Sequence, residues 1–223
     1  NLDYKYVHYE SPDPRGVDVA LLYQPGLFEL TESKPVKIRF PGAPESRTRD
    51  ILYVKGKLPT NDELHVFVCH FPSRLGGELE SEEKRMFVAS VLRQHTDSLF
   101  LLNNKANILL MGDFNDYPVN KSMFEILGAG VPEMPVSNNK IYNLMLPIHQ
   151  SGKGSHKHNG EWGALDQIIV SGSLLLNNSF HCRTARVFEA GFLLTDDNQF
   201  LGKQPFRTYN GMIYQAGYAD HLP

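Results

Sequence analysis

The chain has little of several features that would decide its class at once. It has 2 cysteines among 223 residues, too few for a dense disulfide framework. No apolar run approaches the ~20 residues that a membrane-spanning helix needs. Internal repeats and low-complexity tracts are absent as well. These absences argue against a disulfide scaffold, a helical membrane domain and a repeat protein.

An excess of positive charge is also missing. The chain has 22 Lys and Arg against 25 Asp and Glu, a formal net charge of -3. Proteins that hold nucleic acid through their surface field are usually basic. Nucleic acid is therefore an open but disfavoured partner, and any positive region must be local. The first residue is Asn1 rather than Met, which leaves the compartment open, a secreted or periplasmic location included.

What is present is a composition that can fold. Hydrophobic residues make up 41% of the chain and charged residues 21%, enough apolar material for one substantial core. The segments Leu64–His70, Asn107–Met111 and Leu165–Ser171 are apolar, rich in strand formers and end or begin in polar residues. Ser81 is placed to cap a helix. Strands predominate and no shift in composition marks a boundary, so we predict a single layered α/β domain over residues 1–223.

Three further strands are expected from shorter patterns. Val36–Phe40 and Asp50–Lys55 are of alternating type, and Arg183–Phe188 is a weaker candidate. The segment His156–His158 lies among several glycines. We interpret it as a flexible, substrate-facing loop with positive charge rather than as a zinc site.

Asp113 and Asn115 follow the buried strand Asn107–Met111, in a turn that begins with Gly112. Loops at strand ends are favourable places for a site, because the sheet holds them rigidly. A carboxylate here can bind a metal or activate a water, and an amide can donate to a phosphate oxygen. A turn with purely local hydrogen bonds explains the same residues equally well.

Asp220-His221 is a second polar doublet, suited to metal binding or acid–base work near neutral pH. Taken alone, it is also explained as a surface pair. His70 ends a buried strand and is followed by Ser73 and Arg74, which could orient a substrate or meet an anion. A hydrogen-bonded core histidine is the alternative.

Two aspartates lie within apolar strands. Asp166 and Asp18 would cost free energy there unless each has a partner, and a histidine is a natural one. Together with Asp113, Asn115, His70 and His221 they form a set that suits oxygen-ligand metal chemistry on a phosphate.

Four segments carry a resemblance to a known family. They are His70-Phe71-Pro72-Ser73, Met111-Gly112-Asp113-Phe114-Asn115, Leu165-Asp166-Gln167-Ile168-Ile169 and Asp220-His221-Leu222-Pro223, with Arg15–Tyr23 as a further likeness. In this order they resemble the endonuclease/exonuclease/phosphatase superfamily, the deoxyribonuclease I-like fold. The resemblance implies an α/β (α+β) four-layer αββα sandwich of two packed mixed β-sheets. It also implies attack of water on phosphorus with magnesium or manganese.

The resemblance further assigns roles to residues. Asp113 orients or deprotonates the water, Asn115 holds the phosphate, and Asp220 touches the metal, which Asp113 also approaches. His221 binds the scissile phosphate with Asp166 behind it. His70 assists the leaving group, with Asp18 as its carboxylate partner. Arg15 contacts a phosphate, and Ser73 and Arg74 assist in phosphate binding.

One departure from the family pattern concerns both ends. The N-terminal strands, which carry an asparagine and the principal metal-binding glutamate, are not recognisable in this chain, and neither is the closing strand. About 80 residues are expected to be lacking by comparison with the usual size of a single domain. The chain as given is therefore expected to be truncated at both ends, to bind metal weakly and to have little activity.

Three functions are compatible with these residues. The leading one is a divalent-metal-dependent phosphodiesterase or phosphatase, acting as a monomer on a phosphoester of unknown type. The second is a non-catalytic binding module on the same fold, and the third is a nuclease proper. Substrate class is not encoded in the shared core residues.

Overall fold

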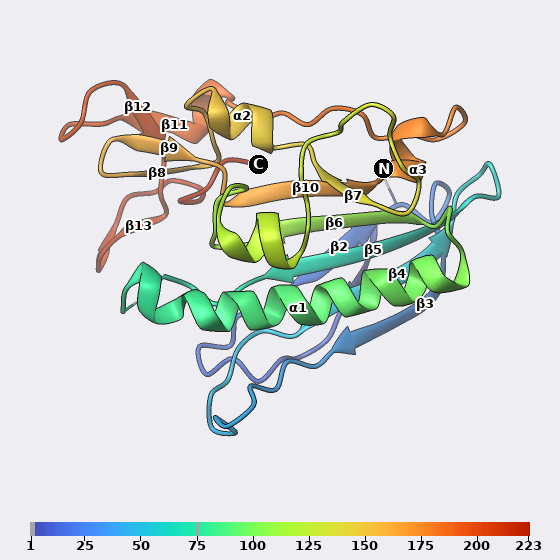
Figure 1. Cartoon of the computed structure of the whole chain (residues 1–223). Helices are drawn as coiled ribbons and strands as arrows, with labels where there is room; N and C mark the ends of the chain where they lie inside the picture. The colour runs from blue at the N-terminus through green and yellow to red at the C-terminus, as the bar shows by residue number, and fades with distance from the viewer. Residues whose placement is uncertain (1–2, 75) are drawn as a thin grey trace.

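The computed structural model describes residues 3–74 and 76–223, and its centre is a six-stranded mixed sheet (Figure 1). Across the sheet the order is β3 (Glu29–Val36), β4 (Ile51–Lys57), β5 (Glu63–His70), β6 (Asn107–Asp113), β10 (Asp166–Ser171) and β7 (Ile141–Asn143). β5 and β6 run parallel, and the other neighbours are antiparallel.

Strand periodicity divides the apolar residues between the two faces of this sheet. Alternate residues of a strand point to opposite sides. In β5, Phe67 belongs to one buried cluster, and Val66 and Val68 belong to the other. In β6, Ile108 and Leu110 face the same side as Phe67. Each face therefore needs its own cover.

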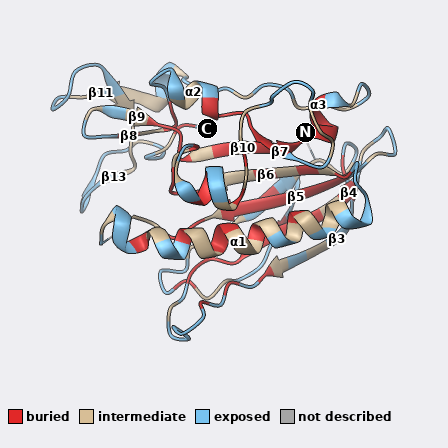
Figure 2. Cartoon of the chain, in the orientation of Figure 1, coloured by how far each residue is buried: buried red, intermediate tan, exposed pale blue. Residues whose placement is uncertain are grey.

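One face is covered by the long helix α1 (Glu78–Leu102), which Figure 1 shows running along the sheet. Its buried side, drawn in red in Figure 2, brings Val88, Ala89 and Leu92 into the cluster around Phe67. α1 connects β5 to the parallel strand β6. Because of this crossover, the start of α1 and the ends of β5 and β6 lie at the same end of the sheet.

The opposite face is covered by a two-stranded sheet of β1 (Lys5–His8) and β2 (Ala20–Tyr23), and by α3 (Gly172–Leu176). Val7 and Leu21 pack there against Leu52 and Val66 of the large sheet. The mixed α/β class is thus confirmed, with two sheets packed on each other. Of the four expected layers, the second sheet is represented among the described residues by this pair alone.

Three hairpins gather near the C-terminus (Figure 1). They are β8–β9 (His156–His158 and Glu161–Gly163), β11–β12 (Leu194–Asp196 and Lys203–Pro205) and β13–β14 (Tyr209–Asn210 and Ile213–Tyr214). The short helix α2 spans Leu146–Gln150, with a π-helical turn at Ser122–Ile126 and a 3-10 turn at Gly191–Leu193.

Two expected strands are wrong. Arg183–Phe188 forms no regular element, and the residues after Val36 lie beyond the end of β3. No helix within the described ranges combines the length and the apolar character needed to cross a bilayer.

Candidate active site

Three neighbouring strands bring three of the expected site residues together. His70 ends β5, Asp113 ends β6 and Asp166 begins β10. In the sheet register, Asp113 lies opposite His70 on one side and opposite Asp166 on the other. His70 Nε2 is 3.5 Å from Asp113 Oδ2. The cluster therefore sits at the end of the sheet where α1 begins.

The turn after β6 fixes the carboxylate of Asp113. Gly112 has φ 128°, and a Cβ built on it would lie 2.0 Å from the carbonyl oxygen of Cys69, so a larger residue does not fit. Asn115, at φ 50°, donates its backbone N–H to Asp113 Oδ1 (2.8 Å). Its Nδ2 group donates to Asp113 Oδ2 (3.1 Å) and to the Phe71 carbonyl (3.0 Å). The local turn and the functional interpretation are thus compatible, because the turn orients the carboxylate.

His221 reaches the same place from the C-terminal segment. Its Nδ1 lies 2.6 Å from Asp166 Oδ2. Ser155 steadies this pair, since its hydroxyl donates to the same carboxylate oxygen (2.6 Å) and its carbonyl accepts from the Leu222 N–H (2.7 Å). The ring centroid of His156 is 4.7 Å from that of His221. The expectation that Asp166 has a histidine partner is therefore met by His221.

The ionisable groups in this cluster shift one another's pKa values. Burial and the neighbouring charge of Asp166 raise the pKa of Asp113 to about 6. Burial opposes ionisation of Asp166 and of His221, but their mutual hydrogen bond and the attraction of opposite charges together outweigh it. As a result the pKa of Asp166 is lowered and the pKa of His221 is raised. The arrangement favours an imidazolium at His221 beside a carboxylate at Asp166.

His70 differs from His221, because its pKa is lowered and not raised. Burial, followed by the nearby guanidinium groups of Arg49 and Arg15, lowers the pKa of His70 to about 4. Its imidazole is therefore neutral near pH 7. In that form it offers one N–H donor and one acceptor nitrogen to a ligand.

One group of potential metal ligands lies in the cluster. Ligand atoms of Asp113, Asp166 and His221 all lie within 4.8 Å of one another. Carboxylate oxygens are the ligands that Mg²⁺ and Mn²⁺ prefer. Because the charge of Asp166 hinders ionisation of Asp113, a cation between the two carboxylates would relieve their repulsion, so the donor set fits such an ion. Asp220 is exposed and lies outside this group.

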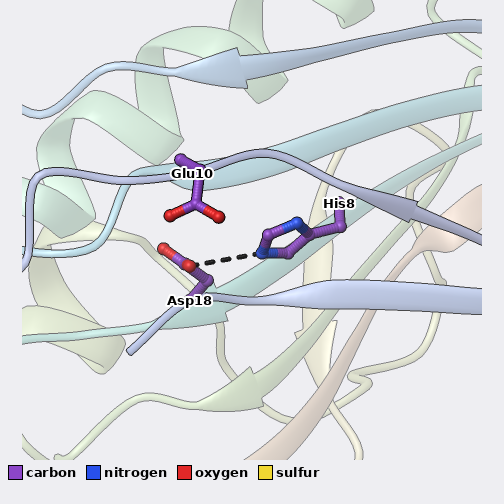
Figure 3. A group of neighbouring side chains, drawn as sticks. All are labelled: His8, Glu10 and Asp18. Atoms are coloured by element: carbon purple, nitrogen blue, oxygen red, sulfur yellow. Dashed lines mark hydrogen bonds and ion pairs between the residues drawn. The ribbon is translucent and has the colours of Figure 1, made fainter. Parts of the chain in front are cut away.

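Asp18 is not the partner of His70, which corrects one expectation. Its Oδ2 lies 3.2 Å from Nε2 of His8, and its Oδ1 accepts from the backbone N–H of Ser11 (2.8 Å). Figure 3 shows His8, Asp18 and the nearby Glu10 carboxylate. The nearest carboxylate to His70 is instead Asp113. The carboxylate of Asp18 is therefore paired with His8 and Ser11, in the segment that contains β1 and β2.

Arg74 is also placed differently from its expected role in phosphate binding. Its guanidinium donates to the Asn115 carbonyl (2.7 Å), Glu78 (3.1 Å) and Asn120 (3.2 Å), and it stacks over the ring of Tyr117. With its donors already used, Arg74 supports the turn at Asn115 rather than facing an anion.

Arg15 and Ser73 border the site without joining the cluster. The side chain of Arg15 pairs with Asp13 (3.2 Å), while half of its surface is exposed. Arg15 is close enough to His70 to lower its pKa. Arg15 and Ser73 both line a cleft beside His70. Their roles toward a phosphate stay predictions.

The segment 156–158 is a hairpin strand and not a flexible loop, another correction. Lys157 is buried, forms an ion pair with Asp197 (2.7 Å) and donates to the Leu201 carbonyl (3.0 Å), so its charge is not offered to a substrate. His156, by contrast, joins the site. Burial, with the charges of His221 and Arg207, lowers the pKa of His156 to about 4.

Sequence reasoning missed Ser155, His156 and Arg49 as parts of the site. Arg49 is buried, donates to Asp13 Oδ2 (2.8 Å) and to the carbonyls of His70 and Phe71, and so holds the end of β5. Arg49 lies two residues before β4, and nothing in the sequence shows that it is buried. Ser155 gives no signal either, because its partners lie far along the sequence.

Fold and site together define a layered α/β protein with histidines and aspartates gathered where the central strands end. The chain belongs to the endonuclease/exonuclease/phosphatase family, whose sequence profile matches residues 1–223. No curated protein matches the sequence.

Solved structures with low sequence identity share the fold. A mannosyl-6-phosphatase of Bacteroides thetaiotaomicron is 17% identical, with a TM-score of 0.60 over 98% of this chain and 74% of that chain. The human nocturnin catalytic domain is 16% identical, with a TM-score of 0.54 over 75% of this chain and 60% of that one. ANGEL2, a 2',3'-cyclic phosphatase, is 13% identical, with a TM-score of 0.56 over 75% and 62%. The chain thus spans about three fifths of the length of the latter two.

Proposed function

We propose that this chain is part of a divalent-metal-dependent phosphoester hydrolase in which water attacks phosphorus. The observation that carries the proposal is the convergence of His70, Asp113, Asp166 and His221 at the end of the central sheet. Two carboxylates, one imidazole whose pKa is raised and one neutral imidazole supply the groups that such a reaction uses: a proton acceptor, a site that favours positive charge and a hydrogen-bond donor.

Asp113 is the residue proposed to act on the water. Without a metal the pKa of Asp113 is raised to about 6, and a bound cation would lower it, so that the group would be an ionised proton acceptor at neutral pH. Asn115 holds both carboxylate oxygens in place, so the base is oriented before substrate arrives. A direct contact of Asn115 with the phosphate stays a prediction, since its amide group already donates to Asp113 and Phe71.

His221 is proposed to stabilise the phosphoryl oxygens. Burial lowers the pKa of His221, but the hydrogen bond with Asp166 and the charges of Asp166, Asp113 and Asp220 together raise it, which favours a positive charge where negative charge develops. His70 lies on the other side of Asp113 and is neutral. It can donate a hydrogen bond to the leaving oxygen.

The carboxylates of Asp113 and Asp166 would hold a magnesium or manganese ion. Such an ion supplies charge neutralisation at the phosphoryl oxygens and at the attacking water. The predicted contact of Asp220 with the metal is a separate proposal, because Asp220 is exposed and outside the group of convergent ligand atoms.

The structural neighbours support a phosphoester substrate at a coarse level. Two of them are described as phosphatases, one of a mannosyl 6-phosphate and one of a 2',3'-cyclic phosphate. The alternative of a non-catalytic module predicts that the same cluster exists without turnover. The two functions are therefore separated by activity alone.

The test is a substrate panel with and without Mg²⁺ or Mn²⁺: plasmid DNA, sphingomyelin, inositol polyphosphates and a generic bis-ester. We expect metal-dependent hydrolysis of at least one substrate and its loss in Asp113→Asn. Turnover that persists undiminished in Asp113→Asn would show that another group activates the water. An absence of turnover by the full-length protein would favour the binding module.

A further inference from the structure

A cleft of about 440 Å³ opens next to the segment that follows β5, the strand that ends at His70. It lies between the segments 13–15 and 47–49, the first turns of α1, and Pro72 and Ser73. His70 is two residues before Pro72, and Arg49 in the cleft wall donates to the His70 carbonyl (3.2 Å). A volume of this size is within the range of about 300–1,000 Å³ that small-molecule sites occupy.

The lining of this cleft is basic, in contrast to the chain as a whole. It contains Arg15, Arg47, Arg49 and Lys84 against Asp13 and Glu80, a formal charge of +2 where the entire chain has -3.

Two of these cations share one carboxylate, because the exposed Arg15 and the buried Arg49 both pair with Asp13. Arg47 and Lys84 are exposed, and neither has a carboxylate within ion-pair distance in the part of the chain that the structure describes. These two charges are therefore available to an anion.

Thr48 gives an independent sign of a ligand. It lines the cleft, is 3% exposed, and its hydroxyl oxygen has no hydrogen-bond partner among residues 3–74 and 76–223. A buried hydroxyl without a partner costs free energy, and native structures seldom keep one unless something satisfies it. The hydroxyl oxygen is itself closed to solvent, so a rotation of the Thr48 side chain toward the cleft would let an anionic oxygen of a ligand accept this hydrogen bond.

We propose that this cleft binds a second phosphate group of the substrate, with Arg47, Lys84 and Thr48 as its ligands. The inference rests on the proposed function and narrows it: the substrate is a small molecule with two phosphates. One phosphate is hydrolysed at Asp113 and His221, and the other is held in the cleft that Ser73 and Arg49 line. Arg47 and Lys84 act there as specificity residues and take no part in the reaction itself.

A small molecule is favoured over a nucleic acid by the extent of the positive region. A polynucleotide is gripped along a stripe of phosphate contacts. Here the basic cleft has a volume of only about 440 Å³, and the chain as a whole is acidic. Preference for a single-stranded oligonucleotide over a small bisphosphate would therefore overturn the proposal.

The site itself is tested by calorimetric binding of inorganic pyrophosphate to the chain without metal. The double variant Arg47→Glu, Lys84→Glu should weaken binding about tenfold or more, since each lost contact is a charged hydrogen bond. The matched control is Lys57→Glu, Lys105→Glu, which makes the same change in charge with exposed lysines at the opposite end of the sheet. Glu80→Gln should act in the other direction and tighten binding.

Equal weakening in the two double variants would reduce the effect to net charge and overturn the inference, as would an absence of pyrophosphate binding to the unsubstituted chain. A second experiment measures turnover and compares fructose 1,6-bisphosphate with fructose 6-phosphate in the presence of Mg²⁺. We expect kcat/KM to favour the bisphosphate about tenfold, and Arg47→Glu, Lys84→Glu to abolish that preference. Hydrolysis of both at the same rate contradicts the second-phosphate site alone, whereas hydrolysis of no phosphoester at all contradicts the proposed function.

Discussion

The candidate active site has two halves that are held in place by different means. The sheet half consists of His70, Asp113 and Asp166, which lie at the ends of three hydrogen-bonded strands. The C-terminal half is His221, which arrives on an irregular segment and depends on Ser155 and Leu222 for its position. One half is fixed by the register of the core. The other is fixed by a few contacts between segments distant in sequence.

This difference predicts how each half responds to damage. Strands β5 and β6 pack on both faces, so a change that displaces the sheet half must also disturb the core. Segments with few buried contacts open locally at a lower free energy than the whole protein unfolds. Changes in the C-terminal half should therefore reduce activity more than global stability. The following predictions test this comparison.

The largest effect is expected from Asp113→Asn, a change in the sheet half that keeps the shape of the side chain. Loss of the base should lower kcat by about 10³-fold, with unfolding free energy changed by less than about 1 kcal/mol. The measurement is steady-state hydrolysis on the best substrate of the panel, together with urea unfolding. A variant that is inactive because it is unfolded would leave the two halves indistinguishable, and the unfolding curve detects that case.

Gly112→Ala should separate stability from chemistry in the same half. Gly112 has φ 128°, and a Cβ would meet the Cys69 carbonyl at 2.0 Å, so β5 and β6 must move apart. We expect a loss of about 3 kcal/mol in unfolding free energy. The matched control is Gly26→Ala, where nothing lies within 4 Å of the new Cβ and the change should be within about 0.5 kcal/mol. Equal effects at both glycines would mean that β5 and β6 tolerate separation.

The sheet half could be predicted from the sequence because its signals are local. The apolar segments Leu64–His70, Asn107–Met111 and Leu165–Ser171 became β5, β6 and β10, with the polar residues at the expected ends. The local sequence patterns do not indicate which strands are neighbours in the sheet. The sheet register that brings Asp113 between His70 and Asp166 is a result of the fold.

Other patterns failed for identifiable physical reasons. Val36, Ile38 and Phe40 are buried as the alternation predicts, but the Ile38 N–H donates to the side chain of Asp50 (2.9 Å) instead of to a strand. Ser81 does not cap α1, because it lies in the first turn and its hydroxyl donates to the Gly77 carbonyl (2.6 Å). At Ile38 a side-chain hydrogen bond replaced the expected strand pairing, and α1 begins at Glu78, three residues before Ser81.

The pH dependence of stability should report on the Asp13–Arg49 pair that holds the end of β5. Burial opposes ionisation of Asp13, but hydrogen bonds from Arg15 and Arg49 outweigh it and hold its pKa well below the usual range. The stabilisation is therefore fully present above about pH 4, the unfolded pKa, and is lost as pH falls toward the folded pKa. We expect a decrease of roughly 2 kcal/mol in this window. In Asp13→Asn, urea unfolding should lose that part of its acid dependence; an unchanged slope would assign it to other carboxylates.

The smallest effect on stability is expected in the C-terminal half, from Ser155→Ala. The substitution removes the hydrogen bond to Asp166 Oδ2 and should cost about 1 kcal/mol of unfolding free energy. Activity should fall about tenfold, because Asp166 then orients His221 less firmly.

If Ser155 has a purely structural role, Ser155→Ala should lower activity by the same factor whether or not His221 is present. If Ser155 acts through His221, the same substitution made in His221→Ala should cause little further loss, because the two residues then form one unit. Additive losses in that double-mutant cycle, measured as kcat/KM, would mean that Ser155 supports the sheet half, and that the boundary between the two halves lies at His221 itself.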